Sequence, residues 1–159
     1  MTFFLATAPK LSFFYGFYKI FFCVISKKIF FMYLLSSCAM LSILVGSILA
    51  LYEVKFKKFL AYSSTVHMGY IALALSTGTK LGAAVSFFYF FIYIMITISI
   101  FCIHLAIRLT WGVHTIKYLT DLVRVRDSHK WLCIFMAASL LSLAGVPPFM
   151  GFFGKLNIF

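Results

Sequence analysis

The sequence predicts an all-α transmembrane fold of about five membrane-spanning helices, arranged as a single membrane domain over residues 1–159. Hydrophobic residues make up 64% of the chain and charged residues only 11%, whereas soluble domains average about 45–50% apolar and about 25% charged residues. Four charge-free stretches exceed the about 20 residues that a helix needs to cross a bilayer core of about 30 Å. The charged residues lie mostly between these stretches, which is typical of a chain that crosses a membrane repeatedly.

The predicted spans follow one another along the chain with short connections. The first is expected within residues 2–26, although Lys10 and Lys19 interrupt it. The next four coincide with the charge-free runs 29–52, 59–79, 81–107 and 131–154. The longest connection, from residue 108 to 130, has room for a short helix lying in the membrane interface, and a plain loop is the alternative.

Basic residues predominate, with 14 Lys and Arg against 3 Asp and Glu and a formal net charge of +11. Nucleic-acid binding proteins gather such residues on a water-facing surface, whereas here they separate apolar runs, so the expected partner is the lipid bilayer and not a nucleic acid. The connection after the second span holds three lysines and the one after the fourth holds five basic residues, against two and one in the other two connections. Short loops rich in Lys and Arg stay on the side where the protein is made. The loops after the second and fourth spans are therefore expected to face the matrix or cytoplasm.

Residue types that carry most enzyme chemistry are not arranged as sites in this sequence. The four cysteines form no C-x-x-C pair and have no histidine nearby at metal-ligand spacing, so no metal site is predicted. The sequence also holds no nucleophile–base pair, no glycine-rich phosphate loop and no paired carboxylates. We therefore expect no catalytic residue and no substrate chemistry by this chain alone.

His67 is the first candidate site residue, because an ionisable group at the centre of a membrane helix costs about 2.5–3.5 kcal/mol. It lies about ten residues into the third stretch and hence about 15 Å deep. Ser63 and Ser64, four and three residues earlier, share its helix face and could form a hydrogen-bonded chain with trapped water. The alternative is a neutral histidine that is satisfied by a neighbouring helix.

Two lysines each allow two interpretations. Lys10 could extend to the surface from the start of a short first helix, or it could be a functional charge within the membrane. A straight helix from residue 131 would carry Lys155 about 36 Å, to the far surface, where a lysine is ordinary. Pro147, Pro148 and Gly151 argue instead for a broken helix, and a broken helix beside a lysine is how transporters present an ion site at the midplane.

Long stretches of this sequence resemble a known family. The segments FFLATAPKLSFF, LALYEVKFKKFLAYSSTVHMGYIALALSTGT, IKYLTDL and LLSLAGVPPFMGFFGKLNIF resemble, in the same order, successive segments of the chain 2 family of respiratory complex I (NADH:ubiquinone oxidoreductase). That family is antiporter-like and is related to the Mrp sodium/proton antiporters. The signatures K-K-x-L-A-Y-S-S-x-x-H-x-G-Y and S-L-A-G-x-P-P-x-x-G-F-x-x-K are long and specific. The resemblance covers essentially the whole chain.

The resemblance implies that the five spans correspond to the family's helices eight to twelve and that the chain is a non-redox, proton-translocating subunit of the complex in the mitochondrial inner membrane. Lys10 and Lys155 match lysines that are thought to carry protons along a hydrated axis, and His67 matches a position lining that axis. Ser63 and Ser64 would bridge gaps with water. NADH, FMN, iron–sulfur clusters and ubiquinone would be bound by other subunits, and no cofactor by this chain.

A complete family member has seven further helices before the eighth. The resemblance therefore implies a C-terminal fragment of a split subunit, whose partners are other complex I subunits and a separate chain carrying the first seven helices. Two alternatives remain at this point. One is an Mrp-type cation/proton antiporter or a hydrogenase membrane subunit, and the other is a structural membrane subunit that does not pump.

Overall fold

The computed structural model describes residues 9–12, 14–16, 18–19, 29–111, 118–122, 126 and 129–158. This part of the chain is helical and contains no strand, apart from one isolated β-bridge between Lys55 and Tyr118. The helices are α2 (Ile29–Tyr52), α3 (Phe56–Ser76), α4 (Lys80–Trp111), α6 (Lys130–Ala144) and α7 (Met150–Leu156). The described residues between 9 and 19 are also helical, and they are referred to below as the N-terminal segment.

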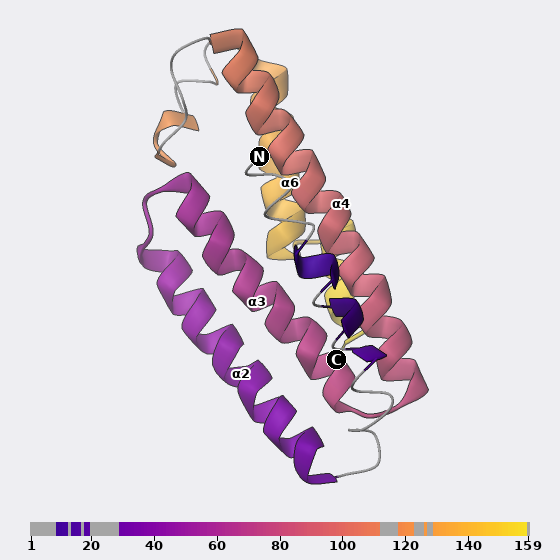
Figure 1. Ribbon diagram of the computed structural model, residues 1–159. Coiled ribbons are helices and arrows are strands. Elements are labelled where there is room, and N and C mark those ends of the chain that lie inside the picture. Colours follow the sequence, from indigo (N-terminus) through magenta and orange to yellow (C-terminus); the bar gives the residue numbers. More distant parts are fainter. Residues whose placement is uncertain are drawn as a thin grey trace.

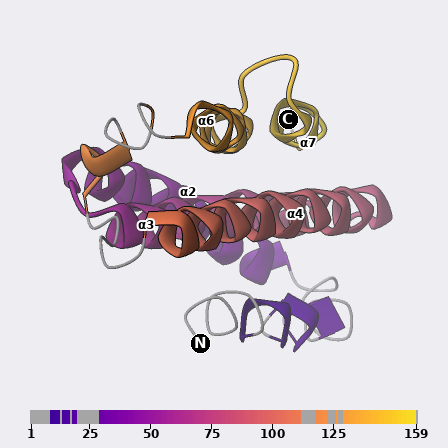
Figure 2. The same ribbon diagram turned by 90° about the horizontal axis from the view of Figure 1, so that it is seen from above.

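Three long helices form a central layer, in which α2 packs on α3 and α3 packs on α4 (Figure 1). Because short connections join them, neighbours in this layer run antiparallel. Figure 2 shows α6 and α7 on one side of the layer and the N-terminal segment on the other. Helix α4 contacts both α6 and α7. Groups on α3 and α4 can therefore be reached from both sides of the layer.

Two of the described helices, Ile29–Tyr52 and Lys80–Leu109, are long and apolar enough to cross a membrane. The first matches the predicted span 29–52. Helix α3 is 21 residues long and begins at Phe56, before the charge-free run 59–79. It can include Lys57 and Lys58 because lysine side chains in a first helical turn can extend toward the surface. The total of five spans stays a prediction, since much of the first one lies outside the described residues.

The last predicted span is divided into two helices. Helix α6 ends at Ala144, and Gly145 adopts a φ of 81°, a left-handed conformation that glycine reaches without steric cost. Pro147 and Pro148 follow, joined by a cis peptide bond, and α7 begins at Met150. Helix α7 then packs against α6 and α4. A straight continuation of α6 through residue 154 is therefore excluded.

Two apolar clusters hold the layers together. The buried members of one are Phe14, Leu35, Ile71, Leu75, Ala83, Tyr89 and Phe90, and those of the other are Phe56, Tyr93, Ile100, Met136 and Leu143. Tyr89 and Tyr93 lie one turn apart on α4 but belong to different clusters. Their polar phenol groups are thus placed where the two clusters meet.

The outward face of α2 is apolar and exposed. Only Leu35, Ala39 and Gly46 of this helix are buried, whereas Phe30 and Tyr33 are 72% and 74% exposed. A continuous apolar surface of this kind would be unfavourable in water. It is suited to lipid tails or to further membrane helices.

Replacing Gly151 with alanine should destabilise the turn between α6 and α7. A Cβ at this position would overlap the backbone carbonyl of Ser142, which cannot move aside as a side chain can. We expect Gly151→Ala to lower the free energy of unfolding by about 1–3 kcal/mol, measured as a lower Tm in lipid nanodiscs. Gly16→Ala is the matched control, because a Cβ there meets nothing within 4 Å. Equal Tm values for the two variants would contradict this packing.

Candidate functional site

Lys155 lies on α7 and reaches back across the break to the end of α6. Its Nζ donates hydrogen bonds to the carbonyl oxygens of Leu143 at 3.1 Å and Ala144 at 2.8 Å. The last four carbonyls of a helix have no partner within that helix. The N–H groups of Gly145 and Val146 bind the Leu141 and Ser142 carbonyls in the arrangement of a Schellman motif. The lysine supplies the donors for the other two, and its positive charge suits the negative end of the helix dipole.

His67 lies in the middle of the central layer and is 5% exposed. Its Nδ1 is 2.7 Å from the hydroxyl of Tyr89 on α4. A phenol can donate or accept a hydrogen bond, and so can each nitrogen of an imidazole, depending on its tautomer. The His67–Tyr89 pair can therefore exchange a proton and keep its hydrogen bond.

Lys10 approaches the same region from the N-terminal segment. Its Nζ donates to the Tyr93 hydroxyl at 3.0 Å. The Tyr93 ring lies 5.1 Å from the His67 ring, centroid to centroid. Tyr93 thus stands between the histidine and this lysine.

Tyr70, one turn after His67 on α3, connects the histidine region to the other lysine. The Nζ of Lys155 lies 5.5 Å from the centroid of the Tyr70 ring, a cation–π distance. The Tyr70 ring contacts the Tyr89 ring edge to face at 6.2 Å. These side chains form one polar row, defined here as Lys155, Tyr70, Tyr89, His67, Tyr93 and Lys10.

The two serines predicted to assist His67 lie beside the row. The Ser63 hydroxyl donates to the Leu60 carbonyl at 2.9 Å and the Ser64 hydroxyl to the Ala61 carbonyl at 2.6 Å. Ser64 is 9% exposed. Both serines line the same adjoining cavity as Tyr93.

Two cavities adjoin the polar row. One of about 560 Å³ is lined in part by Lys10, Ser63, Ser64 and Tyr93. The other, of about 10 Å³, is lined in part by His67, Tyr89 and Ser142, and it is close to the smallest volume that holds one water molecule. Water in these spaces would join groups of the row that are too far apart for direct contact.

The sequence analysis missed the three tyrosines of the row. Tyr89 and Tyr93 are four residues apart in a charge-free helix and therefore share a face. Their hydroxyls need partners when buried, and a histidine on the neighbouring helix needs one too. Because both kinds of group need a hydrogen-bond partner, the sequence could have indicated that these tyrosines pair with the histidine. The pairing of Tyr70 with Lys155 depends on the helix break and could not be found by spacing.

The polar row suits proton transfer better than bond cleavage. Amine, phenol and imidazole groups can each gain or lose a proton, and Tyr89 and Tyr93 place them where two apolar clusters meet. Among the residues that the structure describes, no group of three or more His, Cys, Asp or Glu could hold a metal ion.

Comparison with known proteins identifies a family and several relatives. The family described as NADH:quinone oxidoreductase/Mrp antiporter, transmembrane, matches residues 1–159. The chain is 35% identical to NADH-ubiquinone oxidoreductase chain 2 of Oenothera berteroana, over 100% of this chain and 32% of the relative. It is 34% identical to the chain 2 of Arabidopsis thaliana, over 100% of this chain and 31% of the relative.

A bacterial relative covers less of the chain. NADH-quinone oxidoreductase subunit N of Coxiella burnetii is 32% identical over 76% of this chain and 24% of the relative. The chain thus spans about a third or less of the length of these relatives.

Replacing Tyr89 with phenylalanine should destabilise the site while keeping its shape. The change removes the hydroxyl that pairs with the buried Nδ1 of His67. An unpaired buried polar group costs about 1–3 kcal/mol, so we expect a lower Tm in nanodiscs. Tyr33→Phe, at an exposed position of α2, is the control and should leave the Tm unchanged. If both variants unfold at the same temperature, the His67–Tyr89 hydrogen bond does not stabilise the site.

Proposed function

The chain belongs to the NADH:quinone oxidoreductase/Mrp antiporter transmembrane family, and from this premise we propose that it translocates protons in the membrane arm of respiratory complex I. The observation that carries the proposal is the polar row. It runs from the helix break on one side of the central layer to the N-terminal segment on the other, through two apolar clusters. A row of proton-transfer groups crossing an apolar interior is what lateral proton movement at membrane depth requires.

Lys155 has two defined acceptors, the carbonyls of Leu143 and Ala144. These hold the protonated amine, which then has a third N–H facing the Tyr70 ring. Release of this proton toward Tyr89 and His67 requires a change of rotamer or a bridging water. The break in the helix thus supplies the carbonyl acceptors that hold the protonated Lys155 amine until its proton is released.

His67 and Tyr89 form the centre of the proposed path. When the phenol donates to Nδ1, the imidazole proton is on Nε2, and a proton gained at one nitrogen allows release from the other. Both lysines act electrostatically on this ring. A positive charge arriving at one lysine therefore makes a second charge on His67 less favourable, which would keep protons moving singly. Lys10 receives or supplies the proton through the Tyr93 hydroxyl at 3.0 Å.

The energy for pumping would come from electron transfer in other subunits, which would hold NADH, FMN, the iron–sulfur clusters and ubiquinone. In this proposal the chain is a non-redox subunit of the enzyme and binds no cofactor itself. Its location would be the inner mitochondrial membrane, and the plant relatives carry the name NADH-ubiquinone oxidoreductase chain 2.

The proposed orientation places both basic connections on the matrix side. The bridge between Lys55 and Tyr118, together with the hydrogen bond from the Leu119 N–H to the Val54 carbonyl at 3.0 Å, joins these two connections at the same end of the bundle. This contact supports placing both connections on the same side of the membrane. The positive-inside rule then favours the matrix.

Cation/proton exchange is the second candidate function, because the description of the matched family also includes the Mrp antiporters. In that case transport would follow a cation gradient and would not depend on NADH oxidation. A subunit that only supports the assembly would tolerate neutral substitutions in the polar row.

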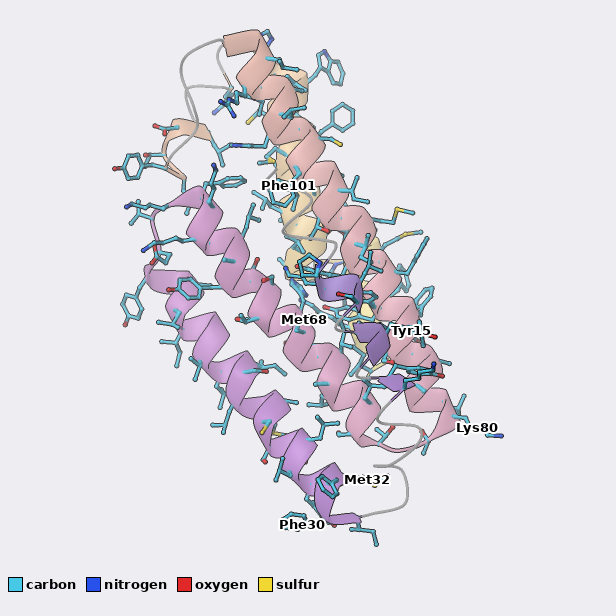
Figure 3. The ribbon with its side chains drawn as sticks, in the orientation of Figure 1. Tyr15, Phe30, Met32, Met68, Lys80 and Phe101 are labelled. Atoms are coloured by element: carbon cyan, nitrogen blue, oxygen red, sulfur yellow. The ribbon has the colours of Figure 1, made fainter. Side chains whose placement is uncertain are left out.

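Replacing Lys155 with glutamine should lower proton pumping without preventing assembly. Glutamine keeps an N–H donor for the α6 carbonyls but cannot carry a proton. We expect protons translocated per NADH oxidised to fall severalfold in reconstituted vesicles, while native gels show the same amount of complex. Lys80→Gln is the control, because Lys80 begins α4 and extends away from the bundle (Figure 3). Full pumping by Lys155→Gln would contradict the proposal, and transport dependent only on a sodium gradient would favour the second candidate.

We also propose that further membrane helices of the family's fold pack against this chain. The exposed apolar face of α2 supports this. Cross-linking mass spectrometry of the intact complex should find other membrane helices linked to residues of this face. A face of α2 that is linked to no other helix would contradict the proposal.

A further inference from the structure

The cavity of about 560 Å³ extends well beyond the polar row. It is lined by Lys10 and Tyr93 and also by Lys57 and Arg108, which are exposed residues near the end of the bundle where the two basic connections meet. We refer to that end as the basic end. Lys155 does not line this cavity. The cavity therefore joins the basic end to one lysine of the row and not to the other.

Polar residues follow the cavity along both helices that enclose it. On α3, Lys57 and Ser64 are seven residues apart, and on α4, Thr97, His104 and Arg108 follow at intervals of seven and four. Such intervals place side chains on one face of a helix. The 15 residues from Tyr93 to Arg108 span about 22 Å. Apolar residues complete the walls, among them Phe101, which Figure 3 labels.

His104 occupies the middle of this polar stripe. Its ring stacks on Phe56 at 5.5 Å between centroids, which constrains the plane of the ring. Its Nδ1 is buried and has no hydrogen-bond partner among the described residues. Buried polar atoms of folded proteins are nearly always paired, often with ordered water. A cavity with room for many water molecules lies against this ring. Most of its wall is apolar, but Lys57, Thr97 and Arg108 also line it, so water is the partner that the geometry provides.

Charged groups face His104 from both helices. Lys57 on α3 and Arg108 on α4 act on its ring electrostatically, and both line the same cavity. Two cations at the mouth keep that end of the cavity hydrated, because their charges cannot be buried dry. The inner end is also polar, since Lys10, Ser64 and Tyr93 meet there.

We propose that this cavity is a water-filled access path by which protons from the basic end reach Lys10, with His104 as a proton relay along it. Water delivers a proton to one nitrogen of the neutral ring, and the proton on the other nitrogen passes to the next water, so that the ring ends as its other tautomer and returns by rotation. The proton ends on the Lys10 amine. Lys10, and not Lys155, is thus the residue of the polar row that receives protons from the basic end. This inference rests on the proposed function of the row.

The first test measures access to the cavity with a thiol reagent. The chain's four native cysteines are replaced, because Cys102 itself lines the cavity, and Thr97→Cys is introduced. Ser99→Cys is the matched control, since it is a half-buried residue of the same helix that does not line the cavity. Vesicles containing the assembled complex, with either face outward, are treated with sulfonatoethyl methanethiosulfonate, an anionic reagent that Lys57 and Arg108 attract. Peptide mass spectrometry gives the rate of modification.

We expect Thr97→Cys to be modified from the basic end at least several times faster than Ser99→Cys. Equal rates, or modification of Thr97→Cys only from the opposite face, would overturn the access path. Modification that begins only after bound phospholipid is stripped from the complex would show a lipid site in place of a water path and would also overturn it.

The second test removes the relay. His104→Phe keeps an aromatic ring to stack on Phe56 but lacks both ring nitrogens. We expect severalfold slower proton pumping, a larger solvent isotope effect in D₂O and an unchanged amount of assembled complex. Normal pumping by His104→Phe together with loss of pumping in Lys155→Gln would overturn the relay and leave the proposed function intact. Normal pumping by both variants would overturn both proposals.

Discussion

The site depends on one requirement, that the carbonyl groups at a broken helix end must find donors where there is no bulk water. Helix α6 ends at Ala144, part-way along the predicted last span, and four carbonyls are left without partners in the helix. Backbone N–H groups of the glycine turn satisfy two of them, and the Lys155 amine satisfies the other two. The lysine is therefore held at a defined depth and orientation. Removing the turn or the lysine would leave polar backbone groups unpaired, at a cost comparable to that of a lost buried hydrogen bond.

The same requirement explains why tyrosines surround the charged groups. A phenol places an apolar ring in a hydrophobic cluster and a hydroxyl at its edge. Tyr89 and Tyr93 each belong to a different apolar cluster, and their hydroxyls meet His67 and Lys10. The polar row can thus cross the apolar interior without interrupting its packing, because the tyrosine rings are themselves part of the two clusters. The same two tyrosines therefore supply apolar rings for packing and hydroxyl groups that can transfer a proton.

The two sides of the row differ in their surroundings. Lys155 is enclosed by carbonyls and by the Tyr70 ring, whereas Lys10 faces a cavity that continues to exposed cations at one end of the bundle. Such asymmetry is useful in a pump, because the ends of a path must open to different sides of the membrane. The outward face of α2, in contrast, is mostly apolar, and its exposed serines Ser37 and Ser47 donate to carbonyls of their own helix. That face is suited to a partner or to lipid.

Much of the fold follows from the sequence itself, because the length of an apolar run and the residues that end it are local properties. The spans 29–52 and 81–107 and the helix break at Pro147 and Pro148 could be predicted in this way, whereas the functional roles of His67, Lys10 and Lys155 stay predictions. The distribution of basic residues predicts that the loops after the second and fourth spans face the matrix or cytoplasm, and their sidedness stays a prediction.

Contacts between segments far apart in the chain were decided only by the tertiary structure. Lys10 and Tyr93 are 83 residues apart, and nothing in local spacing pairs them. The carbonyls that bind Lys155 become acceptors only because the chain turns at Gly145 and places α7 beside α6. The cavity beside His104 likewise depends on how α3 and α4 are set against the N-terminal segment. Sequence thus determined which segments form long apolar helices, and packing of the helices determined which of their polar groups meet.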